Sequence, residues 1–250
     1  MCCFSQPAVV SSTQIFARRG SKDTQYLVYS MNVSAKQDLA MILPLPVPKQ
    51  TAESAVKFID LSKYSEFFTD LDRGFPDAQK SFEGAPGSKG LGAADRGKLA
   101  VVSVGSFEAS FVPTIDDFDR LDKQFRLPKS VWRALPKYKS YGFAVFKLKS
   151  KDRVFHPMAF EFPTSLSSEL FFPTVHIHDG KVRDTADFDH SLYCQIDKIH
   201  PKGPEHWVES AVPVGMIMDY TRGMPVIERY THVFRAKIVG KHKNRDVLVS

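Results

Sequence analysis

Three histidines and a cysteine lie close together in the C-terminal half of the chain and are the first candidates for chemistry. The stretch TVHIHDGKVRDTADFDHSLYC, residues 174–194, contains His176, His178, His190 and Cys194. Residues two apart in a strand project from the same face, so His176 and His178 can reach one ion together. Residues four apart share a face in a helix and in a strand, which gives His190 and Cys194 a common face.

Imidazole and thiolate side chains select the kind of metal that such a site would hold. They suit zinc or copper far better than magnesium or calcium, which prefer oxygen ligands. Asp179, Asp187 and Asp189 are close enough in sequence to orient the imidazoles as hydrogen-bond acceptors. We therefore predict a copper or zinc ion held by His176, His178, His190 and Cys194. In an enzyme, an open coordination position would activate water or dioxygen for a small-molecule substrate.

A second interpretation of the same stretch needs no metal. A His-x-His pair beside a turn can be a simple alternation of solvent-facing residues, and a lone cysteine is often an inert thiol in the core. In that case the protein is a metal-free interaction module.

The N-terminal sequence MCCFS offers a different chemistry. Removal of Met1 would give Cys2 a free α-amine, and a thiol beside an amine can act as a nucleophile with its own general base. Cys2 is therefore the candidate catalytic residue of an N-terminal-nucleophile-type hydrolase. Cys2 and Cys3 could instead supply thiolates to the metal, or belong to a frayed chain end. The first clear strand begins only near Ala8 or Ile15, unlike such hydrolases, where the nucleophile opens the first strand.

Composition predicts a folded globular protein. A chain of 250 residues with 43% hydrophobic and 12% aromatic residues can bury a large core. We expect a single domain, 1–250, whose one candidate internal boundary is the glycine-rich stretch 79–97, predicted to be a loop. That stretch lacks the preceding strand and the Gly-Lys-Ser/Thr ending of a phosphate-binding loop.

Net charge and hydropathy limit the classes of partner and the cellular compartment that we expect for this protein. The formal net charge of +6 is mild and no long basic run is present, so we predict no nucleic-acid partner. The most apolar segment, AMILPLPVP at 40–48, is half the length of a membrane span and contains three prolines. No secretory signal is recognisable at the N-terminus. We therefore expect a cytoplasmic protein with reduced thiols and no membrane partner.

The arrangement of apolar residues predicts a mainly β protein of the α+β class, with an antiparallel β-sandwich-like core and two helical insertions. Runs at 15–20, 24–35 and 38–48 suggest an antiparallel meander, and residues 140–163 suggest two strands joined at SKDR. Helical spacing occurs within 51–76 and within 115–138. The Asp179-Gly180 pair is typical of a two-residue β-hairpin turn. Further strands are expected at 98–113 and in the C-terminal segments VPVGMIMDY, VIERYTHVFRAKIVG and RDVLVS.

The first 60 residues also carry a family resemblance. The runs CCF, QIFARRG, TQYLVYSMNVSAKQDLAMILPLPVP and VKFIDL resemble uncharacterised bacterial proteins that begin Cys-Gly-Gly-Phe after a signal peptide and continue through a strand pair into Leu-Pro-Val-Pro. A fainter likeness occurs at GKHKNRDVLV. This chain lacks the signal peptide and both glycines. The resemblance implies a β-rich fold and no known activity.

Overall fold

The computed structural model describes residues 2–21, 23–75, 99, 101–148, 155–196 and 205–250. The glycine-rich stretch 79–97, predicted as a loop and as the candidate domain boundary, lies outside the described residues. No helix in the described ranges is long and apolar enough to cross a membrane.

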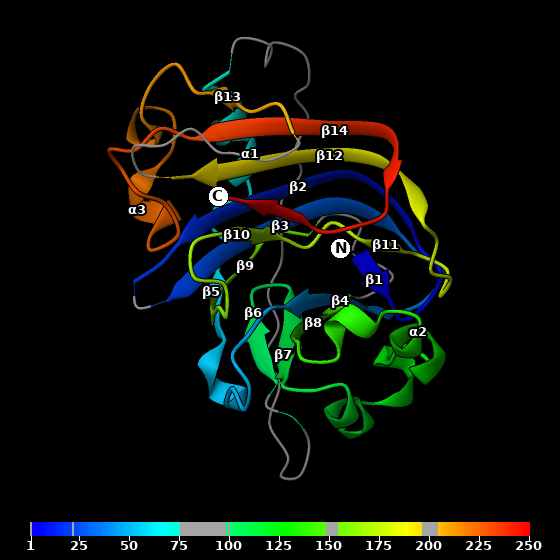
Figure 1. The fold of residues 1–250 in the computed structure, drawn as a ribbon. Coiled ribbons are helices and arrows are strands. Elements are labelled where there is room, and N and C mark those ends of the chain that lie inside the picture. The colour runs from blue at the N-terminus through cyan, green and yellow to red at the C-terminus, as the bar shows by residue number, and fades with distance from the viewer. Residues whose placement is uncertain (1, 22, 76–98, 100, 149–154, 197–204) are drawn as a thin grey trace.

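A seven-stranded sheet forms one half of the molecule (Figure 1). Its strand order is β13-β14-β12-β2-β3-β9-β5, and all neighbouring pairs are antiparallel except β12 with β2. The strands are β2 (Val9–Arg19), β3 (Thr24–Ser34), β5 (Lys57–Asp60), β9 (Met158–Pro163), β12 (Thr185–Gln195), β13 (Val208–Glu209) and β14 (Phe234–Lys243).

A six-stranded sheet packs against the first, in the order β11-β1-β4-β8-β7-β6. Here too all neighbours are antiparallel except one pair, β1 with β11. Its strands are β1 (Cys2–Phe4), β4 (Leu39–Leu45), β6 (Val102–Val104), β7 (Phe107–Val112), β8 (Gly142–Leu148) and β11 (His176–Ile177). A separate two-stranded sheet joins β10 (Leu170–Phe172) to β15 (Val247–Val249).

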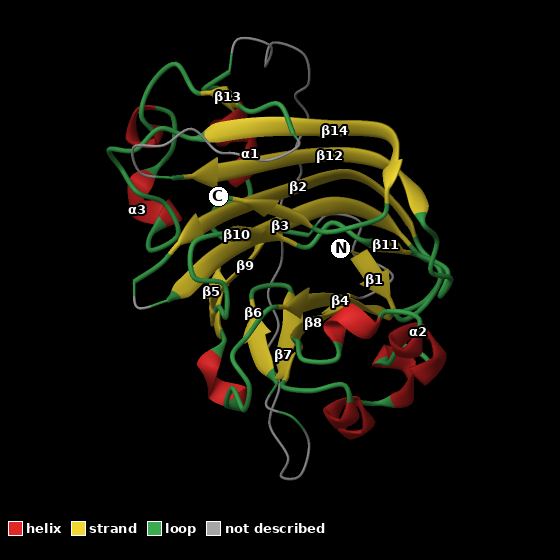
Figure 2. Ribbon diagram, viewed as in Figure 1, coloured by secondary structure: helices red, strands yellow, loops and turns green. Residues whose placement is uncertain are grey.

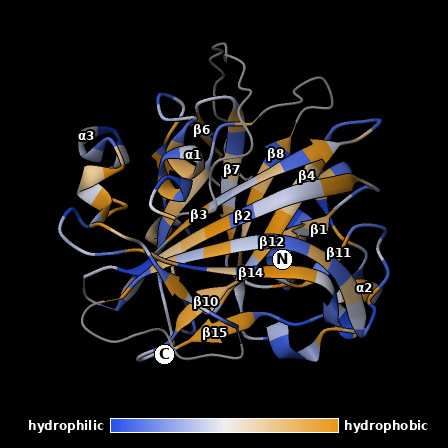
Figure 3. Ribbon diagram, turned by 90° about the horizontal axis from the view of Figure 1, so that it is seen from above, coloured by the Kyte–Doolittle hydropathy of each residue, from blue (hydrophilic) through white to orange (hydrophobic). Residues whose placement is uncertain are grey.

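Alternation along the strands explains why the two sheets stack. In β3, Leu27 and Tyr29 are buried in the central core, whereas Val28 between them faces the opposite side and joins a second cluster. In β4, Met41 faces the central core and Ile42 faces a third cluster. Because successive side chains point to opposite faces, each sheet is covered on both sides. Apolar residues recur along the strands of both sheets (Figure 3).

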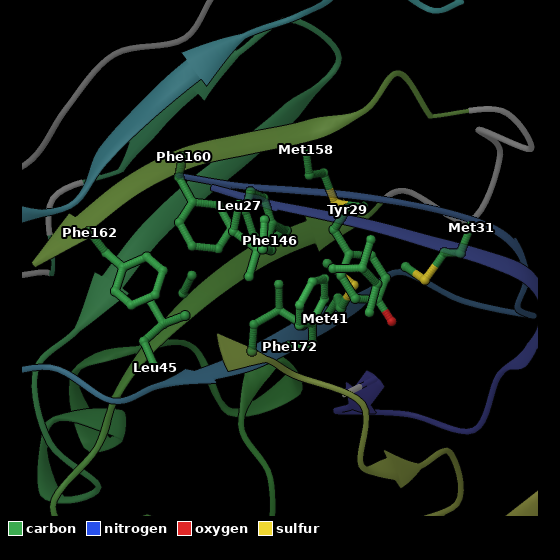
Figure 4. Packing of buried hydrophobic residues seen from close by; sticks show 14 of the residues in the cluster. Leu27, Tyr29, Met31, Met41, Leu45, Phe146, Met158, Phe160, Phe162 and Phe172 are labelled. Atoms are coloured by element: carbon green, nitrogen blue, oxygen red, sulfur yellow. The ribbon is translucent and has the colours of Figure 1, made fainter. Parts of the chain in front are cut away.

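The central core between the sheets is rich in large side chains (Figure 4). Phe146 of β8 packs against Phe160 of β9 with ring centroids 5.8 Å apart, which joins the six-stranded sheet to the seven-stranded sheet. Both residues are fully buried. Burial of one such side chain stabilises the fold by about 1.5–3 kcal/mol, and this cluster is larger than either of the two clusters on the outer faces of the sheets. The labelled members of the cluster are Leu27, Tyr29, Met31, Met41, Leu45, Phe146, Met158, Phe160, Phe162 and Phe172.

Short helices cover the two outer faces (Figure 2). The helix α1 (Phe67–Asp72) and the segment around α3 (Tyr220–Gly223) contribute to the cluster on the seven-stranded sheet. The helix α2 (Lys129–Arg133) contributes Trp132 to the cluster on the six-stranded sheet. Five 3-10 turns complete the described helical structure: η1 (Glu53–Ala55), η2 (Asp116–Arg120), η3 (Lys123–Phe125), η4 (Pro136–Tyr138) and η5 (Val214–Met216).

The predicted fold class is confirmed: the protein is mainly β, with sheets stacked in a sandwich and few helices. The pairing within it differs from the prediction in several places. The predicted three-stranded meander is wrong, because β4 leaves β3 and joins the other sheet. The two strands within 140–163 also separate, since β8 pairs with β4 and β7 while β9 pairs with β3 and β5.

Local predictions were wrong at three further places. Residues 57–60, expected to be helical, form β5, because Phe58 and Ile59 are residue types that favour strands and the edge of β9 supplies a strand partner. The Asp179-Gly180 hairpin does not form: Gly180 has the expected positive φ of 72°, but β12 pairs with β14 and β2, not with β11. Within VPVGMIMDY, predicted as a strand, residues 214–216 form η5.

Candidate functional site

The three predicted histidines meet at one place in the folded chain. His176 Nε2 lies 3.1 Å from His190 Nε2, within hydrogen-bonding distance. The rings of His176 and His178 are stacked with centroids 4.8 Å apart. The prediction that imidazoles from β11 and β12 converge is therefore confirmed by the geometry.

Backbone pairing and one asparagine hold the cluster in position. His176 is the residue of β11 that pairs with Cys2 of β1. The Asn244 side chain accepts a hydrogen bond from the His176 N–H at 2.7 Å and donates to the carbonyl of His176 at 3.0 Å. Phe188 packs against the ring of His176, and Phe4 meets the ring of His178 edge to face. These contacts surround the imidazoles with apolar rings and fixed backbone.

Burial keeps the imidazoles neutral. It lowers the pKa of His176 to about 2, with His190 and His178 adding repulsion between positive charges. It lowers the pKa of His178 to about 4, and the positive N-terminal amine contributes. The pKa of His190 is also lowered by burial, although Asp189 opposes the shift. At neutral pH the cluster is a set of uncharged donors and acceptors.

Cys194 does not belong to this cluster. It lies four residues beyond His190 along β12, a separation of about 13 Å in a strand. Its side chain is fully buried in the central hydrophobic core, where burial raises the pKa of the thiol. The shared face was correctly inferred from the spacing, but a shared face at this separation is not a shared site.

The predicted copper or zinc centre is wrong as a functional interpretation. Among the described residues, no group of three or more His, Cys, Asp or Glu side chains has an arrangement that could hold a metal ion. The stacked rings of His176 and His178 face one another, whereas metals are bound through in-plane nitrogens. The Nε2 atoms of His176 and His190 are directed at one another rather than at a common ion.

The acidic residues expected around the cluster have separate partners. Asp189 Oδ1 lies 3.5 Å from His190 Nδ1, and its other carboxylate oxygen accepts from the Ser12 N–H. Asp179 forms a paired interaction with the Arg183 guanidinium at 2.7 and 2.9 Å. Asp189 therefore lies beside an imidazole, but the predicted hydrogen bond does not form, because the Nδ1 of His190 has no hydrogen-bond partner among the described residues.

Cys2 is placed by its backbone alone. It opens β1 and pairs with His176, while Cys3 next to it is fully buried in the cluster on the outer face of the six-stranded sheet. The predicted catalytic role of the Cys2 thiol is not tested by this arrangement and stays a prediction.

A groove opens beside the histidine cluster. It has a volume of about 1120 Å³. Its walls come from the beginnings of β2 and β12, from the connection after β3, and from the residues that follow β11. His176 and His178 line it, but most of its lining was not foreseen from the sequence, because those residues have ordinary strand patterns. The residues of the two strand walls are Val9, Val10, Thr13, Thr185, Ala186, Asp187, Phe188 and Asp189.

The fold has counterparts among solved structures, although no family model and no curated protein matches the chain. The counterparts belong to a β-rich viral protein, baculovirus P35. A mutated P35 after caspase cleavage is similar with a TM-score of 0.52 and 14% sequence identity, covering 96% of this chain and 99% of that one. Baculovirus P35 itself gives a TM-score of 0.50 and 14% identity, covering 97% of each chain.

A third similar structure, the complex of caspase-8 with P35, gives a TM-score of 0.49. At this identity the likeness establishes the fold alone. The resemblance of the first 60 residues to bacterial proteins is not tested by these matches and stays a prediction.

The prediction of a metalloprotein is wrong, because no group of side chains among the described residues could hold a metal ion. The alternative from the sequence, a metal-free interaction module, agrees with this finding.

Proposed function

We propose that this protein acts by binding another protein, and that its partner is a protease of the caspase class, which it occupies and inhibits. The observation that carries the proposal is agreement of fold over almost the whole chain with P35, a protein seen after caspase cleavage. The partner is thus a macromolecule rather than the small-molecule substrate expected of a metalloenzyme.

The anchoring of residues 75 and 99 supports this proposal. Phe75 is 2% exposed and packs in the cluster on the seven-stranded sheet, while Leu99, also 2% exposed, packs in the cluster on the outer face of the six-stranded sheet. The sequence between them, residues 76–98, contains five glycines and is predicted to be a loop. A protease can bind and cut such a connection while the packed sheets stay folded.

The contacts before residue 76 are strong. The Arg235 guanidinium lies over the Phe75 ring at 4.2 Å from its centroid, and its Nη1 donates to Asp72. The carbonyl of Gly74 accepts from the Ala211 N–H at 3.0 Å. The chain therefore leaves α1 from a fixed point, which lowers the conformational entropy that a bound protease would have to remove.

An inhibition titration tests the proposal. Active-site-titrated caspase-8 is incubated with increasing amounts of the full chain, and residual activity is measured with a fluorogenic peptide. We expect activity to fall in proportion to added protein. The intact masses of the fragments should place one cut within 76–98. Activity that persists at molar excess would contradict the proposal, whether the chain stays whole or is simply degraded.

A matched variant identifies the segment responsible. Residues 82–96 are replaced by a Gly-Ser sequence of equal length, which keeps the connection but removes its side chains. We expect this variant to retain the circular dichroism spectrum and thermal midpoint of the original chain and to lose inhibition. Unchanged inhibition would place the protease contact elsewhere on the molecule.

A further inference from the structure

The seven-stranded sheet divides at one end, between β2 and β12. These two parallel strands pair only where Gln14–Arg18 meets Ser191–Gln195. Both strands extend further, β2 back to Val9 and β12 back to Thr185. Throughout the described residues, no strand pairs with residues 185–190 of β12 on the side facing β2.

Specific residues create this division. The pairing of β2 with β3 shifts register between Ser11 and Gln14, and Ser12 has a positive φ of 55°. The Ser12 N–H donates to the carboxylate of Asp189 instead of to a backbone carbonyl of β12. A side chain thus takes the place of the next ladder hydrogen bond, and the two strands separate from that point. The division is built into the sheet by a β-bulge and a charged side chain.

The groove described above occupies the space between the separated strands. Val9 and Val10 form one wall, and Ala186 and Phe188 form the other. Every residue of a strand carries a backbone donor and acceptor, which alternate between its two edges. Residues 185–190 are bonded to β14 along one edge, so the other edge presents unpaired backbone groups to the groove.

Polar side chains in the groove also lack partners. Thr13 is 1% exposed, yet its Oγ1 has no hydrogen-bond partner among the described residues. The same holds for Nε2 of His178, which is buried. Buried polar atoms without partners are rare because each costs about 1–3 kcal/mol. These two atoms leave hydrogen-bonding capacity at the groove that a hydrogen-bonding ligand would satisfy.

The charged residues of the groove limit the chemistry of the ligand that it can bind. The guanidinium of Arg183 is bonded to Asp179, the carboxylate of Asp189 accepts from Ser12, and the half-buried His176 and His178 are uncharged. The other two charged lining residues, Lys36 and Asp187, are exposed to solvent. A charged side chain that reached the atoms of Thr13 and His178, away from the exposed Lys36 and Asp187, would lose its hydration without meeting an opposite charge. An uncharged hydroxyl or amide can hydrogen-bond to Thr13 and His178.

We propose that the groove binds an extended peptide segment of a partner protein, which adds a strand between β2 and β12. Main-chain hydrogen bonds to the open edge of β12 supply affinity, and uncharged hydroxyl or amide side chains directed at Thr13 and His178 supply selectivity. None of the groove residues belongs to α1 or to the residues flanking 76–98. This site is therefore separate from the protease contact of the proposed function.

Nuclear magnetic resonance of the full ¹⁵N-labelled chain tests this proposal. The probe is a positional-scanning library of acetylated, amidated heptapeptides. Peptides rich in Ser, Thr, Asn and Gln at alternate positions should shift the amide signals of residues 9–13 and 185–190 in a saturable way. The best binder is then remade with N-methyl groups on alternate residues, which removes backbone donors but no side chain. We expect the matching N-methyl pattern to weaken binding by roughly tenfold or more.

Two exposed valines supply matched variants. Val9 on the groove wall is 73% exposed and Val239 on β14, outside the groove, is 70% exposed. Val9→Trp should weaken the peptide by roughly tenfold or more, because the indole narrows the groove, whereas Val239→Trp should leave it unchanged. The proposal is overturned if no library member shifts these signals, or if neither N-methyl pattern weakens the best binder. Equal effects of the two tryptophan variants would also overturn it.

Discussion

The Nε2 atoms of His176 and His190 lie 3.1 Å apart, so two imidazoles from different sheets share one hydrogen bond. One ring must donate and the other accept, which requires at least one neutral ring and is best met when both are neutral. The contact joins β11 of the six-stranded sheet to β12 of the seven-stranded sheet next to the groove.

Acid should destabilise this contact. The pKa of His176 falls from its usual 6.5 to about 2 on folding, mainly through burial. Below pH 6.5 the unfolded chain binds a proton that the folded chain does not, so stability is complete above that pH and declines as pH falls. Each such histidine contributes a slope of about 1.4 kcal/mol per pH unit. The measurement is the urea midpoint at pH 7.5 and at pH 5.

Comparison with His176→Gln isolates the histidine contribution. Carboxylates titrate in both proteins, but glutamine does not titrate. The variant should therefore lose less stability between the two pH values than the original chain. Equal losses in the two proteins would show that the pKa of His176 does not fall on folding.

The Tyr193 hydroxyl ties the seven-stranded sheet to α1 by donating to Asp72 at 2.6 Å. Because Tyr193 is fully buried, Tyr193→Phe leaves the carboxylate without this donor and should lower the free energy of unfolding by about 1–3 kcal/mol. Tyr230→Phe is the control, because Tyr230 is 84% exposed and should change stability by less than about 0.5 kcal/mol. Thermal and urea denaturation measure the free energy of unfolding of the two variants. Equal losses would mean that the hydroxyl contributes nothing.

Asp246 organises the approach to β11. One carboxylate oxygen accepts from the N–H groups of Thr174 and Val175, and the other accepts from the Tyr138 hydroxyl at 2.6 Å. Asp246→Ala leaves these donors without an acceptor and should lower the free energy of unfolding by about 2–4 kcal/mol. Asp116→Ala, at an exposed position, should cost less than about 0.5 kcal/mol. Urea denaturation compares them, and a mild effect at Asp246 would contradict its role as an anchor.

Gly105 occupies a position where a side chain meets both strain and a neighbour. Its φ is +56°, and a Cβ there would lie 2.2 Å from His156 Nε2. Gly180 has a similar φ of +72° but open space around it. Both alanine variants carry the backbone penalty of roughly 1 kcal/mol, and Gly105→Ala should lose about 1–3 kcal/mol more. Equal losses in denaturation experiments would show that His156 moves aside without cost.

Local alternation made much of the sandwich predictable. The run containing Leu27, Val28 and Tyr29 forms a strand buried on both faces because the layers on either side each need an apolar surface. The pairing of strands was harder to predict from the sequence. Nothing within residues 38–48 shows that β4 pairs with β8, about a hundred residues later, because pairing depends on how whole sheets close.

The candidate site was predictable only in part. The alternation His176-x-His178 was enough to place two imidazoles together, and His190 joined them from β12. Cys194 was misplaced because face periodicity carries no information about distance along a strand. The groove was not foreseen, since it depends on the bulge at Ser12 and on a carboxylate 177 residues away in sequence.

Formation of a complex with caspase-8 tests the proposed function of this chain most directly. Equimolar active caspase-8 and full chain are mixed, and the mixture is separated by size exclusion with light scattering. We predict a single species whose mass is the sum of the two proteins, stable through the column. Separate elution of free protease and free chain at every mixing ratio would contradict the claim that this fold serves to bind a protease.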